Sequence, residues 1–324
     1  MIRLIRAELR RLTARRMTLI TALLLLVAVG LFQLVVNEQV APPSAADVAQ
    51  QRQYYEQAHR DWEQYQAEGV EDCVETGETR EACQASYPEP TPADYALTAT
   101  PFADAGSSAV LLGTLLAMLS AYLVSASSIG AEYTSGALAN WLTFVPQRLR
   151  VFATKLTAVV AFSAVVGAVV SFVMLGLAAL LTRAYDGALT GLDGLAADAG
   201  RAVVLSAVAG VLGFALALVS RHTVAAVGVV LAYLVVGSVL SGLTRDADGA
   251  LAWLPPYLPE NNVQAFLQHG MSYEQYRETT TAQGTSYEEV VRHLTFGHSA
   301  VYWLVVVAVA VAVAALVFRR RDVT

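Results

Sequence analysis

Long apolar runs alternate with polar segments along the 324-residue chain. Six runs can cross a bilayer as helices, because a helix rises about 1.5 Å per residue and the hydrocarbon core is about 30 Å thick. Helices are required because lipid offers backbone groups no partners, and the alternating pattern of barrel strands is missing. The pattern predicts an all-α membrane protein with six transmembrane helices, at 17–36, 107–130, 156–181, 202–220, 223–243 and 299–318.

The segment before the first span, residues 1–16, has its apolar residues on one helical stripe and arginines on the flanks and the opposite face. This pattern is typical of an amphipathic interfacial helix whose arginines face anionic headgroups. Simple anchoring of the first span by positive charge is the alternative. The first span exceeds a signal-peptide core of about 7–15 residues, and no clear cleavage site follows, so we expect it to be retained.

The insert 37–106 is polar and contains good helix formers over 46–67, which predicts a helix there. Cys73 and Cys83 are the only cysteines. We expect them to form a disulfide, because this insert is predicted to lie where disulfides persist. Two unpaired thiols are the alternative.

The insert 244–298 begins with a proline-rich stretch that we expect to dip into the outer leaflet, because Pro255, Pro256 and Pro259 forbid a regular helix there. Further on, Ser272 and Ser286 each precede a Gln or Glu by three residues, the pattern of a capping box. Two short helices are therefore expected, which would make both inserts helical.

Basic residues define the expected orientation. If both termini and the segments 131–155 and 221–222 lie inside, that side carries thirteen basic and three acidic residues, and the outside carries eight basic and twenty-four acidic. Positive charge collects on the cytoplasmic side of membrane proteins. The sequence thus predicts cytosolic termini, including the tail 319–324, and extracytoplasmic inserts.

The energy source is constrained by what the spans lack. The predicted spans contain no Asp, Glu, Lys, Arg or His, which counts against an ion-driven carrier, although backbone and hydroxyl sites for sodium stay open. The chain has no G-x-x-x-x-G-K-[ST] motif and a single lysine, Lys155, so it has no P-loop for nucleotide. If ATP drives it, a separate chain hydrolyses the ATP.

The segment 131–155, between the second and third spans, has an apolar and aromatic centre with polar flanks. Buried aromatic residues often dominate the energy of a protein interface, so it suits docking of a soluble partner. A short connector in which Trp141 anchors at the headgroups is the alternative. The segment has the spacing E-x3-G-x-L-x3-L-x3-P-x-R-x6-K, formed by Glu132, Gly136, Leu138, Leu142, Pro146, Arg148 and Lys155. This spacing resembles the cytosolic loop of type-2 ABC transporter permeases, the membrane subunits of bacterial ATP-binding-cassette exporters.

The resemblance covers about two dozen residues as a motif and most of the chain as an architecture. It implies that 136–143 is a coupling helix that inserts, with Trp141, into an ATPase subunit, and that 2–16 is an elbow helix. Arg221 and His222 would form a second, smaller contact. The chain would bind no cofactor itself, because ATP and Mg²⁺ belong to the partner. It would be no enzyme but the permease of a bacterial inner-membrane exporter, paired with a second permease chain. Alanine at position 137, where such permeases often carry threonine, is a mild departure.

Several further features are less specific. Hydroxyls on the second span could line a translocation path or bond to their own helix: Ser120, Ser125, Ser127 and Ser128. The small residues Ala209, Gly213 and Ala217, and also Ala308 and Ala312, could serve pairing of two chains or packing within one. The five histidines have no metal spacing, and no catalytic triad or nucleic-acid footprint is present.

Two other functions stay open at this stage. The chain could be a non-transporting sensor or assembly protein whose extracytoplasmic inserts bind a partner, or an ion-driven carrier. The substrate is not defined: lipids, amphipathic drugs and peptide antibiotics all fit an apolar path with hydroxyls.

Overall fold

A computed structural model describes residues 2–137, 140, 147–281 and 284–320. Six of its helices are long and apolar enough to cross a membrane, which confirms the six-span prediction: α2 (Arg16–Val40), α5 (Phe102–Thr134), α7 (Arg148–Ala184), α8 (Leu192–Ser220), α9 (Thr223–Leu243) and α11 (Phe296–Arg320). The other elements are α1 (Ile2–Thr13), α3 (Ala45–Glu75), α4 (Arg80–Ser86), the 3-10 turn η1 (Pro255–Tyr257), α10 (Pro259–Leu267), β1 (Gly270–Thr281) and β2 (Gly284–Thr295).

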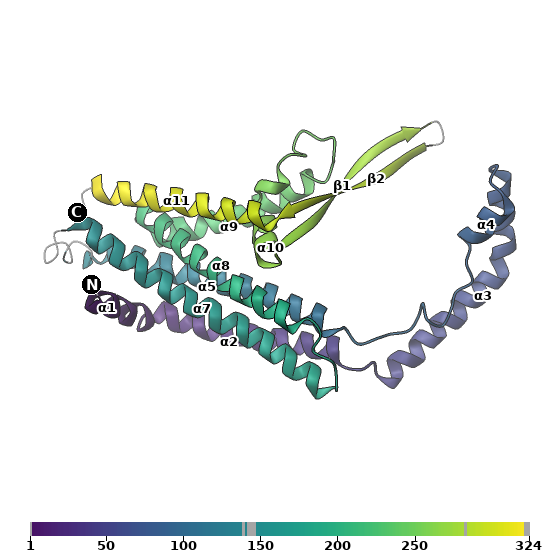
Figure 1. Ribbon diagram of the computed structural model, residues 1–324, viewed down its shortest axis with the longest axis horizontal. Coiled ribbons are helices and arrows are strands. Elements are labelled where there is room, and N and C mark those ends of the chain that lie inside the picture. The colour runs from purple at the N-terminus through teal and green to yellow at the C-terminus, as the bar shows by residue number, and fades with distance from the viewer. Residues whose placement is uncertain (1, 138–139, 141–146, 282–283, 321–324) are drawn as a thin grey trace.

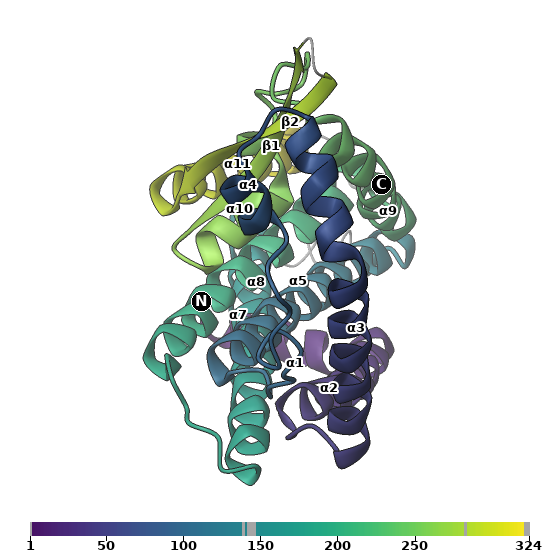
Figure 2. The same cartoon turned by 90° about the vertical axis from the view of Figure 1, so that its right-hand side faces the viewer.

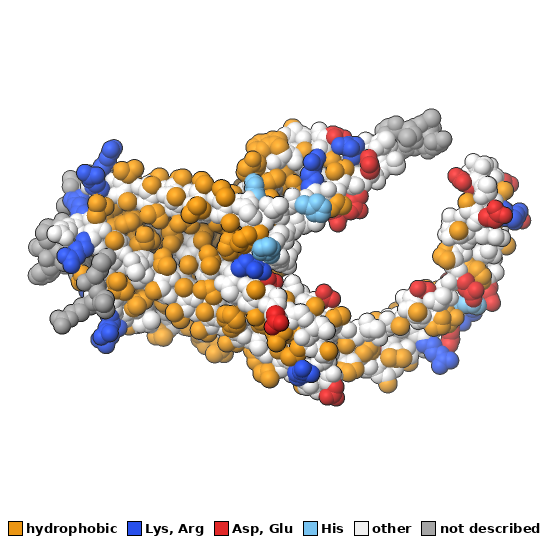
Figure 3. All heavy atoms as spheres, in the orientation of Figure 1, with side chains coloured by type: hydrophobic (Ala, Val, Ile, Leu, Met, Phe, Trp, Pro, Cys, Tyr) orange, Lys and Arg blue, Asp and Glu red, His pale blue; other side chains and the backbone are white. Residues whose placement is uncertain are grey.

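The six long helices form one bundle, with both chain termini at the same end (Figure 1). We call this end the terminal end, and the opposite end, from which α3, α4 and the strands project, the insert end. Lys and Arg side chains gather at the terminal end, Asp and Glu side chains gather at the insert end, and hydrophobic side chains cover the surface between (Figure 3). A basic end, an acidic end and an apolar surface between them are typical of a chain that crosses a bilayer.

The centre of the bundle is formed by α5 and α8, which are the most buried of the six helices. Small residues permit this close packing: a Cβ on Gly213 of α8 would lie only 2.3 Å from the carbonyl oxygen of Tyr122 in α5. Ala209 and Ala217 on the same stripe are also buried. The stripe on α8 therefore serves packing within the chain.

The outer helices α2, α9 and α11 present mostly apolar, exposed side chains, as expected for surfaces covered by lipid. On α11, Ala308 and Ala312 are exposed, unlike the small residues of α8. Small residues thus allow close packing of α5 and α8 in the interior, whereas those on α11 lie at the periphery.

The insert 37–106 forms an arm made of α3, α4 and a returning segment, which lies in front of the bundle when viewed from the insert end (Figure 2). The predicted helix is confirmed and extends to Glu75, starting from a capping box between Ser44 and Asp47. Hydrogen bonds from Ser44 lower the pKa of Asp47. The expected disulfide is confirmed, with a Cα to Cα distance of 5.7 Å between Cys73 and Cys83. It joins α4 to the end of α3.

The expectation of two short helices in the second insert is wrong. Strands β1 and β2 form an antiparallel hairpin instead, in which Ser272 pairs with His293. The Ser272 Oγ atom lies 2.9 Å from Nδ1 of His293, and Ser286 Oγ donates to the carbonyl of Thr279 on the other strand. The serines that suggested helix caps therefore bind across the hairpin.

The hairpin is fixed by Gln275, whose side chain is fully buried. Its Nε2 atom donates to the carbonyls of Thr244 at 2.9 Å and Ala252 at 3.0 Å, and its Oε1 atom accepts from Nε of Arg292 at 2.9 Å. These contacts link the hairpin to the loop after α9. They are formed between segments far apart in sequence, so local capping signals did not predict them.

Candidate functional site

The terminal end brings together the two segments with which the sequence predicts docking of a partner. Helix α5 ends at Thr134, and Gly136 follows with a φ of +67°, a conformation that glycine adopts without strain. In the turn between α8 and α9, the guanidinium carbon of Arg221 lies 5.7 Å from the ring centroid of Tyr133. The turn with Arg221 and the last turn of α5 are therefore neighbours.

The predicted coupling residues are described in part. Glu132 lies in the last turn of α5, Arg148 starts α7, and His222 is exposed directly before α9. Four others lie outside the described residues: Leu138, Trp141, Leu142 and Pro146.

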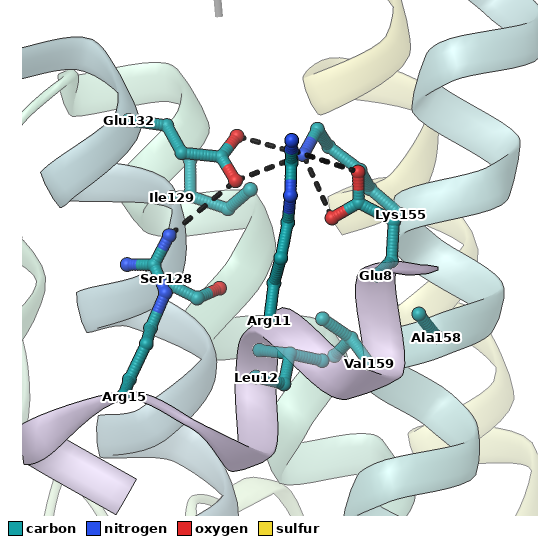
Figure 4. Close-up of a pocket in the computed structure, with 10 residues that line it drawn as sticks. All are labelled: Glu8, Arg11, Leu12, Arg15, Ser128, Ile129, Glu132, Lys155, Ala158 and Val159. Carbon is teal, nitrogen blue, oxygen red and sulfur yellow. Dashed lines mark hydrogen bonds and ion pairs between the residues drawn. The ribbon is translucent and has the colours of Figure 1, made fainter. Parts of the chain in front are cut away.

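A buried ion cluster lies next to these segments (Figure 4). The Lys155 Nζ atom on α7 is 3.1 Å from Glu8 Oε2 on α1, and 3.0 and 2.7 Å from the two carboxylate oxygens of Glu132 on α5. The exposed fractions of these side chains are 4% for Lys155, 9% for Glu8 and 7% for Glu132. One ammonium group is thus shared by two carboxylates from two different helices.

Arg15 adds a second positive charge from the corner between α1 and α2. Its Nη2 atom lies 3.4 Å from Glu132 Oε1, and its Nη1 atom donates to the carbonyl of Ser127 at 3.4 Å. Arg11 lies 3.8 Å from Glu8 at the more exposed side. The two more buried cations, Lys155 and Arg15, match the two carboxylates in number, which helps to offset the loss of hydration, while Arg11 is half exposed.

The fold places this cluster through apolar packing of α1. Leu12 is 5% exposed and belongs to the same apolar cluster as Ile129 of α5 and Val159 of α7. Glu8 lies one helical turn before Leu12, so it meets Lys155, which lies one turn before Val159. The interfacial helix α1 predicted from the sequence therefore also packs against the bundle.

The cluster lines a small cavity of about 10 Å³, room for roughly one water molecule. A wider, open hollow of about 790 Å³ adjoins it. The hollow is lined by the same Arg11, Arg15 and Glu132, and by Ser135 and Asn140 from the segment after α5. The cluster thus reaches from the bundle interior to the surface at the terminal end.

The hydroxyls predicted for a translocation path lie inside the bundle. Ser120 and Ser128 donate to backbone carbonyls of their own helix, those of Leu116 and Ser125, at 2.7 and 2.8 Å. Ser125 lies close to Gly210 of α8, and Ser127 is buried as well. Their use in transport stays a prediction.

Within the described ranges, no group of three or more His, Cys, Asp or Glu side chains is arranged to hold a metal ion. The cluster of Glu8, Glu132 and Lys155 offers fixed opposite charges. It suits a mechanical connection between helices.

Sequence reasoning missed Glu8 and Arg15. Two signals were available: Glu8 is the only acidic residue among residues 1–37, and Lys155 is the only lysine in the chain. A lone acid on a basic segment and a lone lysine at the start of a span suggest partners for each other. The sequence does not reveal that they meet, since 146 residues separate them.

The fold and the charge distribution define a multi-pass helical membrane protein with one basic end (Figure 3). A family model described as ABC-2 family transporter protein matches residues 3–323, so the chain belongs to the ABC-2 transporter family. No curated protein and no solved structure matches the chain. The resemblance found in the motif of 132–155 is thereby confirmed. The chain is a membrane component of a transporter, a class that associates with an ATP-binding-cassette component and is not itself catalytic.

Proposed function

We propose that this chain is the permease subunit of an ATP-binding-cassette exporter and moves an amphipathic or hydrophobic substrate outward. A separate ATPase subunit, which binds ATP and Mg²⁺, docks at the terminal end. A second permease chain, identical or different, completes the transporter in the bacterial inner membrane.

The observation that carries this proposal is the arrangement of the terminal end within a member of the ABC-2 family. The last turn of α5 and the turn with Arg221 are neighbours through Tyr133. Both lie at the end where basic side chains gather (Figure 3), which is the cytosolic end by the positive-inside rule. One docking face can therefore receive one soluble subunit on the side where ATP is available.

The mechanism is conformational. Two ATPase subunits close on ATP, the segments between α5 and α7 move with them, and the paired permeases change from inward-accessible to outward-accessible. A ligand shifts such an equilibrium only by its different affinity for the two states. Closure of the ATPase subunits on ATP supplies this difference in affinity. The paired permeases respond by changing from the inward-accessible to the outward-accessible state.

The test is purification of the tagged chain from the membranes of its own host, followed by identification of bound subunits and assay of ATP hydrolysis. We expect an ATP-binding-cassette subunit in the wild-type sample and its loss in Trp141→Asp. The matched control is Trp253→Asp, because Trp253 is an exposed tryptophan in the loop between α9 and η1. A wild-type chain without such a subunit, or an unchanged complex in Trp141→Asp, would refute the proposal in favour of a sensor or assembly protein.

The substrate class is tested on the same complex in lipid vesicles. A panel of lipids, amphipathic drugs and peptide antibiotics is added, and ATP hydrolysis is measured. We expect stimulation by at least one amphiphile and none by small hydrophilic solutes.

A further inference from the structure

We propose that Lys155 is a positioning residue that holds the end of α5 and the start of α7, the helices on either side of the ATPase-docking segment, to α1. These contacts, which we call the clamp, make α1, α5 and α7 move as one body during transport. This inference rests on the proposed function, because the movement it describes is driven by the ATPase subunit. It assigns a role to Lys155, Glu8 and Arg15 that neither the motif nor the fold alone supplies.

The first part of the clamp joins the two helices between which the docking segment lies. The segment leaves α5 after Thr134 and enters α7 at Arg148. Glu132 lies just before it and Lys155 lies two turns after its end, and the two side chains are in contact at 2.7 and 3.0 Å. A displacement of the segment is therefore transmitted to α5 and α7 together.

The second part of the clamp adds α1 and its corner with α2. Glu8 binds the same ammonium group at 3.1 Å, and Arg15 joins Glu132 to the corner and also donates to the carbonyl of Ser127 on α5. These contacts connect α1 to α5 and α7 through Lys155, Glu8 and Glu132, which are at least nine-tenths buried, and through Arg15, which is 24% exposed. Such pairs act over a low dielectric and are screened little by salt.

Lys155 is the central member because both carboxylates depend on it. Without its ammonium group, Glu8 and Glu132 become like charges in a buried site, with Arg15 and Arg11 near its edge. The repulsion favours separation of α1 from α5. A buried ionic network is often no more stable than apolar residues of the same volume, so its retention is consistent with a role in geometry.

The experiment measures distances between spin labels in the complex of the full chain with its ATPase subunit, with and without ATP plus vanadate. Labels are attached at the exposed positions Arg10→Cys on α1, Leu149→Cys on α7 and Leu316→Cys on α11. The two native cysteines are joined in the disulfide and do not react. In the wild type we expect the distance from 10 to 149 to stay constant, and the distance from 10 to 316 to change with nucleotide.

In Lys155→Met we expect the 10 to 149 distance to broaden and the nucleotide-dependent change of the 10 to 316 distance to be lost. The matched control is Arg6→Met, which removes one positive charge from an exposed position of α1 and should behave as wild type. If Lys155→Met responds to nucleotide as the wild type does, the clamp is refuted while the proposed function stands. A 10 to 316 distance in the wild type that ignores nucleotide also refutes it.

A second variant separates positioning from simple stabilisation. The triple variant Glu8→Gln, Glu132→Gln, Lys155→Met removes all three charges of the triad, and Arg11 and Arg15, which lose these carboxylate partners, are both partly exposed to water, so its thermal unfolding midpoint should return toward the wild-type value. Its 10 to 149 distance should remain broad. If the triple variant regains both the midpoint and the wild-type distances, the cluster only stabilises the fold. If no ATPase subunit accompanies the wild-type chain, the proposed function and this inference fail together.

Discussion

The contact between α5 and α8 provides a sharp test of how the bundle is packed. Gly213 of α8 lies against the backbone of Tyr122 in α5, and a Cβ at this position would be 2.3 Å from its carbonyl oxygen and 3.0 Å from its carbonyl carbon. Ordinary contact begins at 3.4 Å. Because the obstructing atoms are backbone, they cannot rotate away as a side chain would.

The substitution Gly213→Ala therefore forces α5 and α8 apart by about 1 Å at this point, which is overpacking of a buried contact. Overpacking costs about 1–3 kcal/mol. Alanine recovers about 0.8–1 kcal/mol through its higher helix propensity, so the net expected loss is roughly 0–2 kcal/mol.

The assay is the thermal unfolding midpoint of the purified chain in detergent, with Gly176→Ala as the matched control. Gly176 lies in α7 with no atom within 4 Å of an added Cβ, so only the propensity gain applies and its midpoint should rise. We expect the midpoint of Gly213→Ala to lie below that of wild type and clearly below that of the control. Equal midpoints for the two variants would show that α5 and α8 do not approach this closely.

Two predictions concern the insert end. Replacing both Cys73 and Cys83 by serine releases a loop with a sequence separation of 10, which the chain-entropy model values at about 2–3 kcal/mol; hydrogen exchange should accelerate in α4 and at the end of α3 but not in the bundle. Acceleration spread evenly over the chain would contradict this local effect. Gln275→Leu removes the donor to the carbonyls of Thr244 and Ala252, so the hairpin should lose about 1–3 kcal/mol and be cut by protease at lower concentration than wild type. Unchanged cleavage would show that these bonds do not hold the hairpin.

The sequence by itself determined the membrane class, the helical arm and the family. Each of these depends on local information: the length of an apolar run, the propensity of a segment such as 46–67, or the spacing of the motif from Glu132 to Lys155. The pairing of Cys73 with Cys83 followed from the cysteine count. These features do not require knowledge of which segments meet in space.

Only the tertiary structure decided the form of 270–295. Its serines and glutamates have the pattern of helix caps, but its Tyr, Thr and Val residues favour strands, and local preferences in such a segment are weak. Burial of Gln275 against the loop after α9 fixed the hairpin. The face on which Gly213 packs likewise depended on its neighbour, because a stripe of small residues fits any helix that approaches it.

The ion cluster is the clearest case of a feature that the sequence left undetermined. Glu132 and Lys155 are part of the family motif, yet their contact with Glu8 requires α1 to fold back against α7 through Leu12. Charges separated along the chain gain their interaction only when apolar packing removes them from water and sets their distance. The spans and the motif follow from residues that are close together in the sequence. The ion cluster that joins Glu8 to the motif follows from the packing of α1 against the bundle.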